Sequence, residues 1–142
     1  YEAPVYSAWS IKNRTPLIRI PAVHGEGTRI ELRSPDAAAN PYLALAVCLA
    51  AGLQGIREKI QPPYPVNQNV FEMTEPQRRE LGIEALPGSL LEAAREFEKD
   101  EFIQKVLGED LAGKYVAAKK AEYKAYRAQV TEWELNEYLQ KY

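Results

Sequence analysis

The chain contains two short runs of branched residues, Thr15-Pro16-Leu17-Ile18-Arg19-Ile20-Pro21 and Thr28-Arg29-Ile30-Glu31-Leu32-Arg33. Prolines punctuate the first run, and the glycine-bearing segment 24–27 separates the two. Branched residues bounded by proline and glycine are typical of strands joined by a turn. We therefore predict an antiparallel β-hairpin, which makes residues 1–36 the strand-rich part of the chain.

Residues 37–142 carry helix start signals instead. Asn40 followed by Pro41 is an N-cap with a first-turn proline, and the helix that it begins should run to about Ile60. This helix is apolar nearly all round, so we expect other elements to cover most of it and to bury Cys48. Two later segments, Ser89–Glu92 and Thr131–Glu134, have the sequence of a capping box. The expected fold class is α+β, with a short hairpin followed by a mainly helical region.

Composition restricts the kind of protein. The 142 residues are 46% hydrophobic and 27% charged, as in a globular domain, and the net charge of −2 gives no general case for nucleic acid or an anionic membrane. One cysteine cannot form an internal disulfide, which favours a reducing, cytoplasmic location. The opening residues lack a signal peptide, and the apolar segment 37–56 is too interrupted to span a membrane. No membrane and no direct nucleic-acid partner are expected.

The C-terminal segment carries an apolar stripe at helical spacing, formed by Leu135, Tyr138, Leu139 and Tyr142. A helix of about eleven residues is marginal by itself in water. The stripe therefore needs a surface to dock on, either in the body of this chain or in a neighbouring subunit.

One strand alternates charged and apolar residues. Arg29, Glu31 and Arg33 should line one face, and Ile30 and Leu32 the other. Two guanidinium groups, each roughly 6.6 Å along the strand from a carboxylate, suit an anionic ligand together with a divalent metal. The alternative is an ordinary ladder of charge pairs on a solvated sheet face.

The first 36 residues hold four arginines and one lysine. Arginine grips phosphate and carboxylate oxygens in pairs, whereas lysine offers a point charge, so the bias favours phosphate chemistry. Arg19 should share the face of Glu31 only if the hairpin pairs residues whose numbers have an even sum, such as 50 or 52.

Four segments together resemble bacterial class I glutamine synthetase. They are Tyr1-Glu2-Ala3-Pro4-Val5, Asn13-Arg14-Thr15-Pro16-Leu17-Ile18-Arg19-Ile20-Pro21, Thr28-Arg29-Ile30-Glu31-Leu32-Arg33-Ser34-Pro35-Asp36 and Ala39-Asn40-Pro41-Tyr42-Leu43-Ala44-Leu45. The resemblance covers residues 1–142 and implies the C-terminal part of the catalytic domain. It implies an ATP-dependent glutamate–ammonia ligase that forms glutamine through γ-glutamyl phosphate.

The resemblance also implies roles for single residues in ATP and metal binding. Arg14, Arg19 and Arg29 match arginines of the ATP site, and Arg14 also matches a catalytic residue near the glutamate substrate. Glu31 matches a carboxylate ligand of an active-site Mg²⁺ or Mn²⁺. Because one carboxylate cannot build such a site, we predict that the isolated chain is inactive.

For the amino-acid substrate, Arg33 matches an arginine that grips glutamate. Glu2 matches a catalytic glutamate that guards the glutamate entrance and helps to take a proton from ammonium. Phe71 stands where the adenylylated branch of the family carries tyrosine, so the resemblance is to the non-adenylylated branch. In that branch, some members bind nitrogen-response transcription regulators.

The family forms dodecamers of two rings, and the C-terminal stripe resembles the tail that docks on the opposing ring. Two alternatives remain open at this point. One is a related ligase that joins glutamate to an organic amine. The other is a non-catalytic helical module for assembly or regulator binding, which keeps the arginine hairpin as inheritance.

Overall fold

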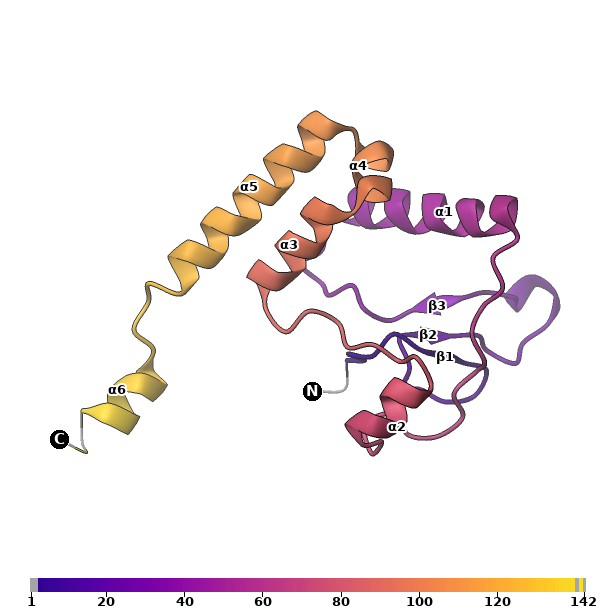
Figure 1. Cartoon of the computed structure of the whole chain (residues 1–142), viewed down its shortest axis with the longest axis horizontal. Helices are drawn as coiled ribbons and strands as arrows, with labels where there is room; N and C mark the ends of the chain where they lie inside the picture. The colour runs from indigo at the N-terminus through magenta and orange to yellow at the C-terminus, as the bar shows by residue number, and fades with distance from the viewer. Residues whose placement is uncertain (1–2, 140, 142) are drawn as a thin grey trace. The chain divides into compact units, whose positions relative to one another are not determined.

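Figure 1 shows the chain as a computed structural model that describes residues 3–139 and 141. The residues fall into two compact units, 1–86 and 87–142. Across the described residues, three short strands precede the α-helices, which confirms the α+β class. Within the same part of the chain, no helix combines the length and the apolar character needed to cross a bilayer.

The three strands of the first unit form one sheet in the order β1-β2-β3 (Figure 1). They are β1 (Trp9–Ser10), β2 (Ile18–Arg19) and β3 (Glu31–Leu32), and the short helix η1 (Gly25–Gly27) lies in the connection before β3. The pairing of β2 with β3 is antiparallel, which confirms the predicted hairpin. The strand β1, which the sequence did not predict, runs parallel to β2.

A small core packs segment 66–83 against the residues that lead into β1. Its members are Ala8, Val66, Val70, Met73 and Ile83, with Tyr6 packed beside them. Backbone hydrogen bonds between residues 5–7 and 84–86, together with a β-bridge, join the two ends of the unit. The short helix α2 (Glu75–Glu80) lies between the last core segments. This core fixes the loops around β1 and β2.

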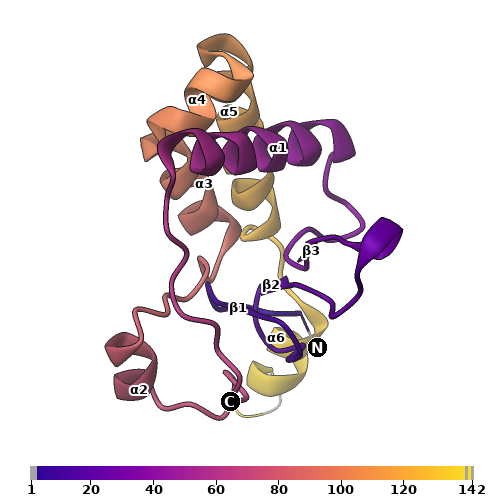
Figure 2. The ribbon, with the colours of Figure 1, turned by 90° about the vertical axis from the view of Figure 1, so that its right-hand side faces the viewer.

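The helix α1 (Pro41–Glu58) starts where the sequence predicted, because the Asn40 Oδ1 accepts from the N–H groups of Tyr42 and Leu43 at 3.0 and 3.3 Å. Within the first unit, the prediction that other elements cover it is wrong. It contacts no other helix or strand among the described residues of that unit, and Figures 1 and 2 both show it clear of the strands. Ile56 is 76% exposed, and Cys48 is exposed rather than buried. The apolar character of the helix predicts that its surface is covered, but the described residues of the first unit supply no element that covers it.

The second unit is helical, with α3 (Leu90–Lys99), α4 (Glu101–Leu107), α5 (Glu109–Tyr126) and α6 (Glu132–Tyr138). The predicted capping box at Thr131 is confirmed, because Thr131 and Glu134 bond to each other in both directions. At Ser89 only half of the predicted box forms: the Ser89 hydroxyl accepts from the Glu92 N–H, but the Glu92 carboxylate accepts from the Gly88 N–H instead of that of Ser89. Helices α3 and α4 pack on α5, and they bury Ala94, Ala112 and Val116.

The C-terminal helix α6 contacts no other helix among the described residues of the second unit. Of its predicted stripe, Leu135, Tyr138 and Leu139 are exposed, and Tyr142 lies outside the described residues. The stripe therefore has no docking surface within the second unit.

Candidate functional site

The hairpin register brings charged side chains of β2 and β3 together. Ile18 pairs with Leu32 and Arg19 with Glu31, so the paired numbers sum to 50, as the shared-face prediction required. The N–H of Arg33 donates to the Leu17 carbonyl at 2.9 Å, so the ladder continues past β3. Alternation along the strand then puts Arg29, Glu31 and Arg33 on one face.

The carboxylate of Glu31 lies between two guanidinium groups. Arg19 Nη1 donates to Oε2 at 2.8 Å, and Arg29 donates to Oε1 from Nη2 at 2.8 Å and from Nε at 3.1 Å. The hydrogen bond from Arg19, supported by the hydrogen bond and charge of Arg29, holds the pKa of Glu31 below its usual value. Glu31 is therefore ionised at neutral pH, as a metal ligand or an arginine partner must be.

Two arginine nitrogens of the same face are buried without an acceptor. Arg19 Nε and Arg33 Nη1 have no hydrogen-bond partner among the described residues. A buried donor left in this state costs about 1–3 kcal/mol, so it favours a ligand that brings an acceptor. Phosphate and carboxylate oxygens match guanidinium donors in both charge and geometry. The face therefore fits an anion of this kind.

Metal binding fits the site only in part. Glu31 offers one carboxylate, and a divalent hard cation takes about six or more oxygen ligands. Across residues 3–139 and 141, no three His, Cys, Asp or Glu residues gather in a way that could hold a metal ion. Glu31 can thus serve as one ligand of a Mg²⁺ or Mn²⁺ site whose other ligands are not among these residues.

Of the other predicted site residues, Arg14 is exposed in the loop between β1 and β2, and Glu2 lies outside the described residues. The loop around Arg14 is held by the side chains of Ser10, Asn13 and Thr15, which were not among the predicted site residues. The spacing Asn-x-Thr, which favours a turn closed by the Asn side chain, was the signal that could have found the last two.

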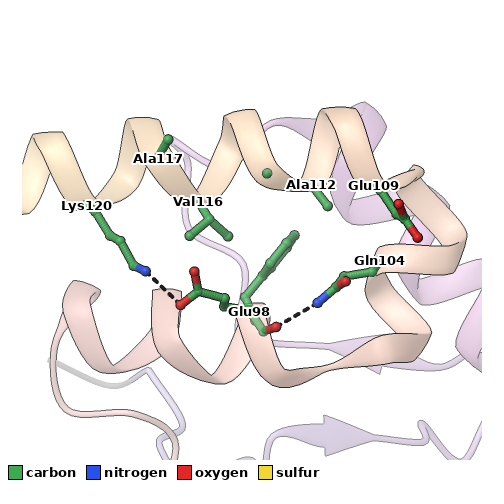
Figure 3. A pocket seen from close by; sticks show the side chains of 9 residues that line it. Glu98, Gln104, Glu109, Ala112, Val116, Ala117 and Lys120 are labelled. Atoms are coloured by element: carbon green, nitrogen blue, oxygen red, sulfur yellow. Dashed lines mark hydrogen bonds and ion pairs between the residues drawn. The ribbon is translucent and has the colours of Figure 1, made fainter.

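The second unit carries a separate cavity of about 290 Å³ between α3, α4 and α5 (Figure 3). Ala112 and Val116 of α5 line it, and the ion pair between Lys120 Nζ and Glu98 Oε2, at 2.7 Å, joins α5 to α3 beside them. Gln104 Nε2 donates to the Glu98 carbonyl at 2.6 Å. Lys120, Glu98 and Gln104 of this cavity bond to one another and join the helices, whereas two arginine nitrogens of the hairpin face have no acceptor among the described residues.

The comparison with protein families agrees with the hairpin chemistry. The family model described as "Glutamine synthetase, catalytic domain" matches residues 1–138. The chain belongs to this family. A glutamine synthetase from Clostridium saccharobutylicum is 55% identical over 142 residues, which are 100% of this chain and 32% of that protein. One from Thermotoga maritima is 53% identical over 139 residues, or 98% of this chain and 32% of that protein.

Solved structures give the same fold. The chain matches a cryoEM structure of Plasmodium falciparum glutamine synthetase with a TM-score of 0.76 at 23% identity, over 97% of this chain and 35% of that one. It matches a crystal structure of a "novel glutamine synthase homolog" with a TM-score of 0.63 at 29% identity, over 100% of this chain and 31% of that one. The chain thus spans about a third of the length of the glutamine synthetases that it matches.

Proposed function

We propose that this chain is the C-terminal part of the catalytic domain of an ATP-dependent glutamate–ammonia ligase, which forms glutamine through γ-glutamyl phosphate. The family assignment supports a glutamine-forming ligase. The observation that carries the proposal is the hairpin face, where two arginines hold one carboxylate and two further arginine donors lie buried and unpartnered among the described residues.

We assign the residues at the ATP end of the site by the charged group that each one binds. Arg14, Arg19 and Arg29 bind the ATP phosphates and neutralise the charge that spreads over the transferring phosphoryl oxygens. Glu31 contributes one ligand to a Mg²⁺ or Mn²⁺ ion, which supplies charge neutralisation at the phosphates when bound. Arg19 and Arg29 currently share the Glu31 carboxylate, so a phosphate group would compete with it for the same donors.

At the amino-acid end, Arg33 and Arg14 bind the carboxylates of glutamate. Glu2 guards the glutamate entrance and accepts the proton that ammonium must lose before nitrogen can attack the activated γ-carboxyl carbon. Phosphate then leaves as the amide bond forms. In this proposal, the arginines of the chain position ATP and glutamate, the two anionic substrates, for the reaction.

The enzyme as a whole is proposed to be a cytoplasmic dodecamer of the non-adenylylated class I branch. Phe71 has no hydroxyl that could accept an adenylyl group. Leu135 and Tyr138 of α6 are exposed together with its C-cap Leu139, and these apolar residues suit docking on another subunit. A nitrogen-response transcription regulator is a further proposed partner.

The activity is tested by exchange of segments. In the glutamine synthetases of C. saccharobutylicum and T. maritima, the matching segment is replaced by residues 1–142, and ATP-dependent glutamine formation is measured. We expect activity in at least one exchanged enzyme, and none from the isolated chain. Two exchanged enzymes that assemble and melt like their parents but form no glutamine would refute the proposal. A preference for polyamines over ammonium would favour the related amine ligase.

A further inference from the structure

The loop that presents Arg14 is fastened on both sides of that residue. We propose that Asn13, acting with Thr15, is a positioning residue that fixes the backbone of Arg14 for phosphoryl transfer. This inference rests on the proposed function, because it assigns Asn13 a role through Arg14. The proposed function assigns neither Asn13 nor Thr15 a contact with a substrate.

The Asn13 side chain uses both ends of its amide. Its Nδ2 donates to the carbonyl of Gln68 at 2.5 Å and to that of Val66 at 3.5 Å. Its Oδ1 accepts from the backbone N–H and the hydroxyl of Thr15, both at 3.0 Å. One side chain therefore closes the turn around Arg14 and ties that turn to a segment more than fifty residues away.

The orientation of this amide is fixed by its partners. Two carbonyl oxygens need a donor on one side, and an N–H with a hydroxyl hydrogen needs an acceptor on the other. A rotated amide would place its oxygen against the Val66 and Gln68 carbonyls. Aspartate at position 13 would do the same with a charge, although its size and shape match asparagine.

Thr15 and Ser10 complete the connection. The Thr15 hydroxyl accepts from the Val70 N–H at 3.1 Å, so it links the turn to the most buried side chain of the core. Ser10 is fully buried, and its hydroxyl accepts from the Asn13 N–H at 3.2 Å and donates to the Asn67 Oδ1 at 3.2 Å. The turn is thus anchored to both strand β1 and segment 66–70.

Arg14 itself is exposed between these two fixed neighbours. A long side chain on a fixed backbone searches fewer positions than one on a mobile loop, which lowers the entropic cost of placing its guanidinium. Loss of the connection leaves Arg14 chemically intact but poorly placed. A displacement of about 1 Å in such a group is enough to reduce a rate by about 100-fold.

The test uses the active exchanged enzyme and a double-mutant cycle. We expect Asn13→Asp and Thr15→Val to lower kcat by about tenfold or more, with the KM for ATP changed by less than about threefold because Arg19 and Arg29 still bind the nucleotide. In an Arg14→Ala background, Asn13→Asp should lower kcat by a further factor of less than about two, because the residue through which Asn13 acts is gone.

Matched variants separate positioning from general damage. Thr15→Ser keeps the hydroxyl and should retain activity within about twofold, and Lys12→Ala, at an exposed side chain of the same loop, should do likewise. Hydrogen exchange at the Val70 amide should accelerate in Thr15→Val and stay slow in Thr15→Ser.

The outcomes are distinguishable. An assembled but inactive parent exchange refutes the proposed function, and this inference with it. If the parent exchange is active but Asn13→Asp lowers kcat by the same factor with and without Arg14, only the inference is overturned. A Thr15→Ser enzyme with a kcat as low as that of Thr15→Val overturns it as well. If Asn13→Asp fails to fold, the kcat values of Thr15→Val and Thr15→Ser, each measured with Arg14 and with Arg14→Ala, test the inference in the same way.

Discussion

The stability of the first unit should depend on Val70, which is 0% exposed at the centre of its core. Val70→Ala removes two methyl groups. At about 0.8 kcal/mol for each buried carbon, the lost transfer free energy is about 1.6 kcal/mol. Ala8, Met73 and Ile83 can relax only partly into the space, so the cavity raises the expected loss toward about 3 kcal/mol.

The assay is urea unfolding followed by tryptophan fluorescence. Trp9 lies in β1, and its Nε1 donates to the Pro63 carbonyl at 2.7 Å, so its emission reports on the first unit. A Trp133→Phe background removes the other tryptophan of the chain. With a slope of about 2 kcal/mol per molar urea, the midpoint should fall by about 1 M.

The control removes the same atoms where no core surrounds them. Val23 lies in the same unit and is 46% exposed, and Val23→Ala should change the free energy of unfolding by less than about 0.5 kcal/mol. Equal midpoints for Val70→Ala and the parent would refute the reasoning, because the small core would then not be the source of stability in this unit.

Three further predictions concern the site and the C-terminal helix. Arg19 and Arg29 lower the pKa of Glu31 in the folded state, so the stability that Glu31 contributes is complete above its ordinary pKa of 4.5 and is lost as the pH falls through the folded-state pKa. Glu31→Gln should therefore lose less stability than the parent between about pH 6 and about pH 3, as measured by the urea midpoints. Thr131→Ala removes the capping hydroxyl of α6 and should weaken this helix by about 1 kcal/mol, seen as faster amide exchange in residues 132–138 with α3 unchanged. Deletion of residues 131–142 from an exchanged enzyme should reduce its assembly size in size-exclusion chromatography, and an unchanged elution volume would remove the support for tail docking.

The features that could be predicted from the sequence are local ones. The hairpin and its register follow from alternation and from the turn between the runs, so Arg19 and Glu31 were expected on one face. The caps at Asn40 and Thr131 follow from side chains that reach backbone groups within three residues. These choices need no knowledge of the rest of the chain.

The features that could not be predicted depend on distant residues. Strand β1 has two residues and no periodicity, and it is defined by its parallel partner. The role of Asn13 depends on carbonyls 53 and 55 residues away. The exposure of Cys48 depends on whether a partner for α1 exists, because periodicity describes only the surface that such a partner would cover.

The exposed apolar surface of α1 has a consequence for the expression of residues 1–142 by themselves. Leu45 and Leu49 are exposed on an 18-residue helix that has no neighbouring helix or strand among the described residues of the first unit, and an apolar surface of this kind binds chaperones and promotes aggregation. Yield after overexpression should accordingly respond to chaperone supply more than to any change in the small core, and solubilising replacements along this surface should raise recovery without altering the melting of either unit.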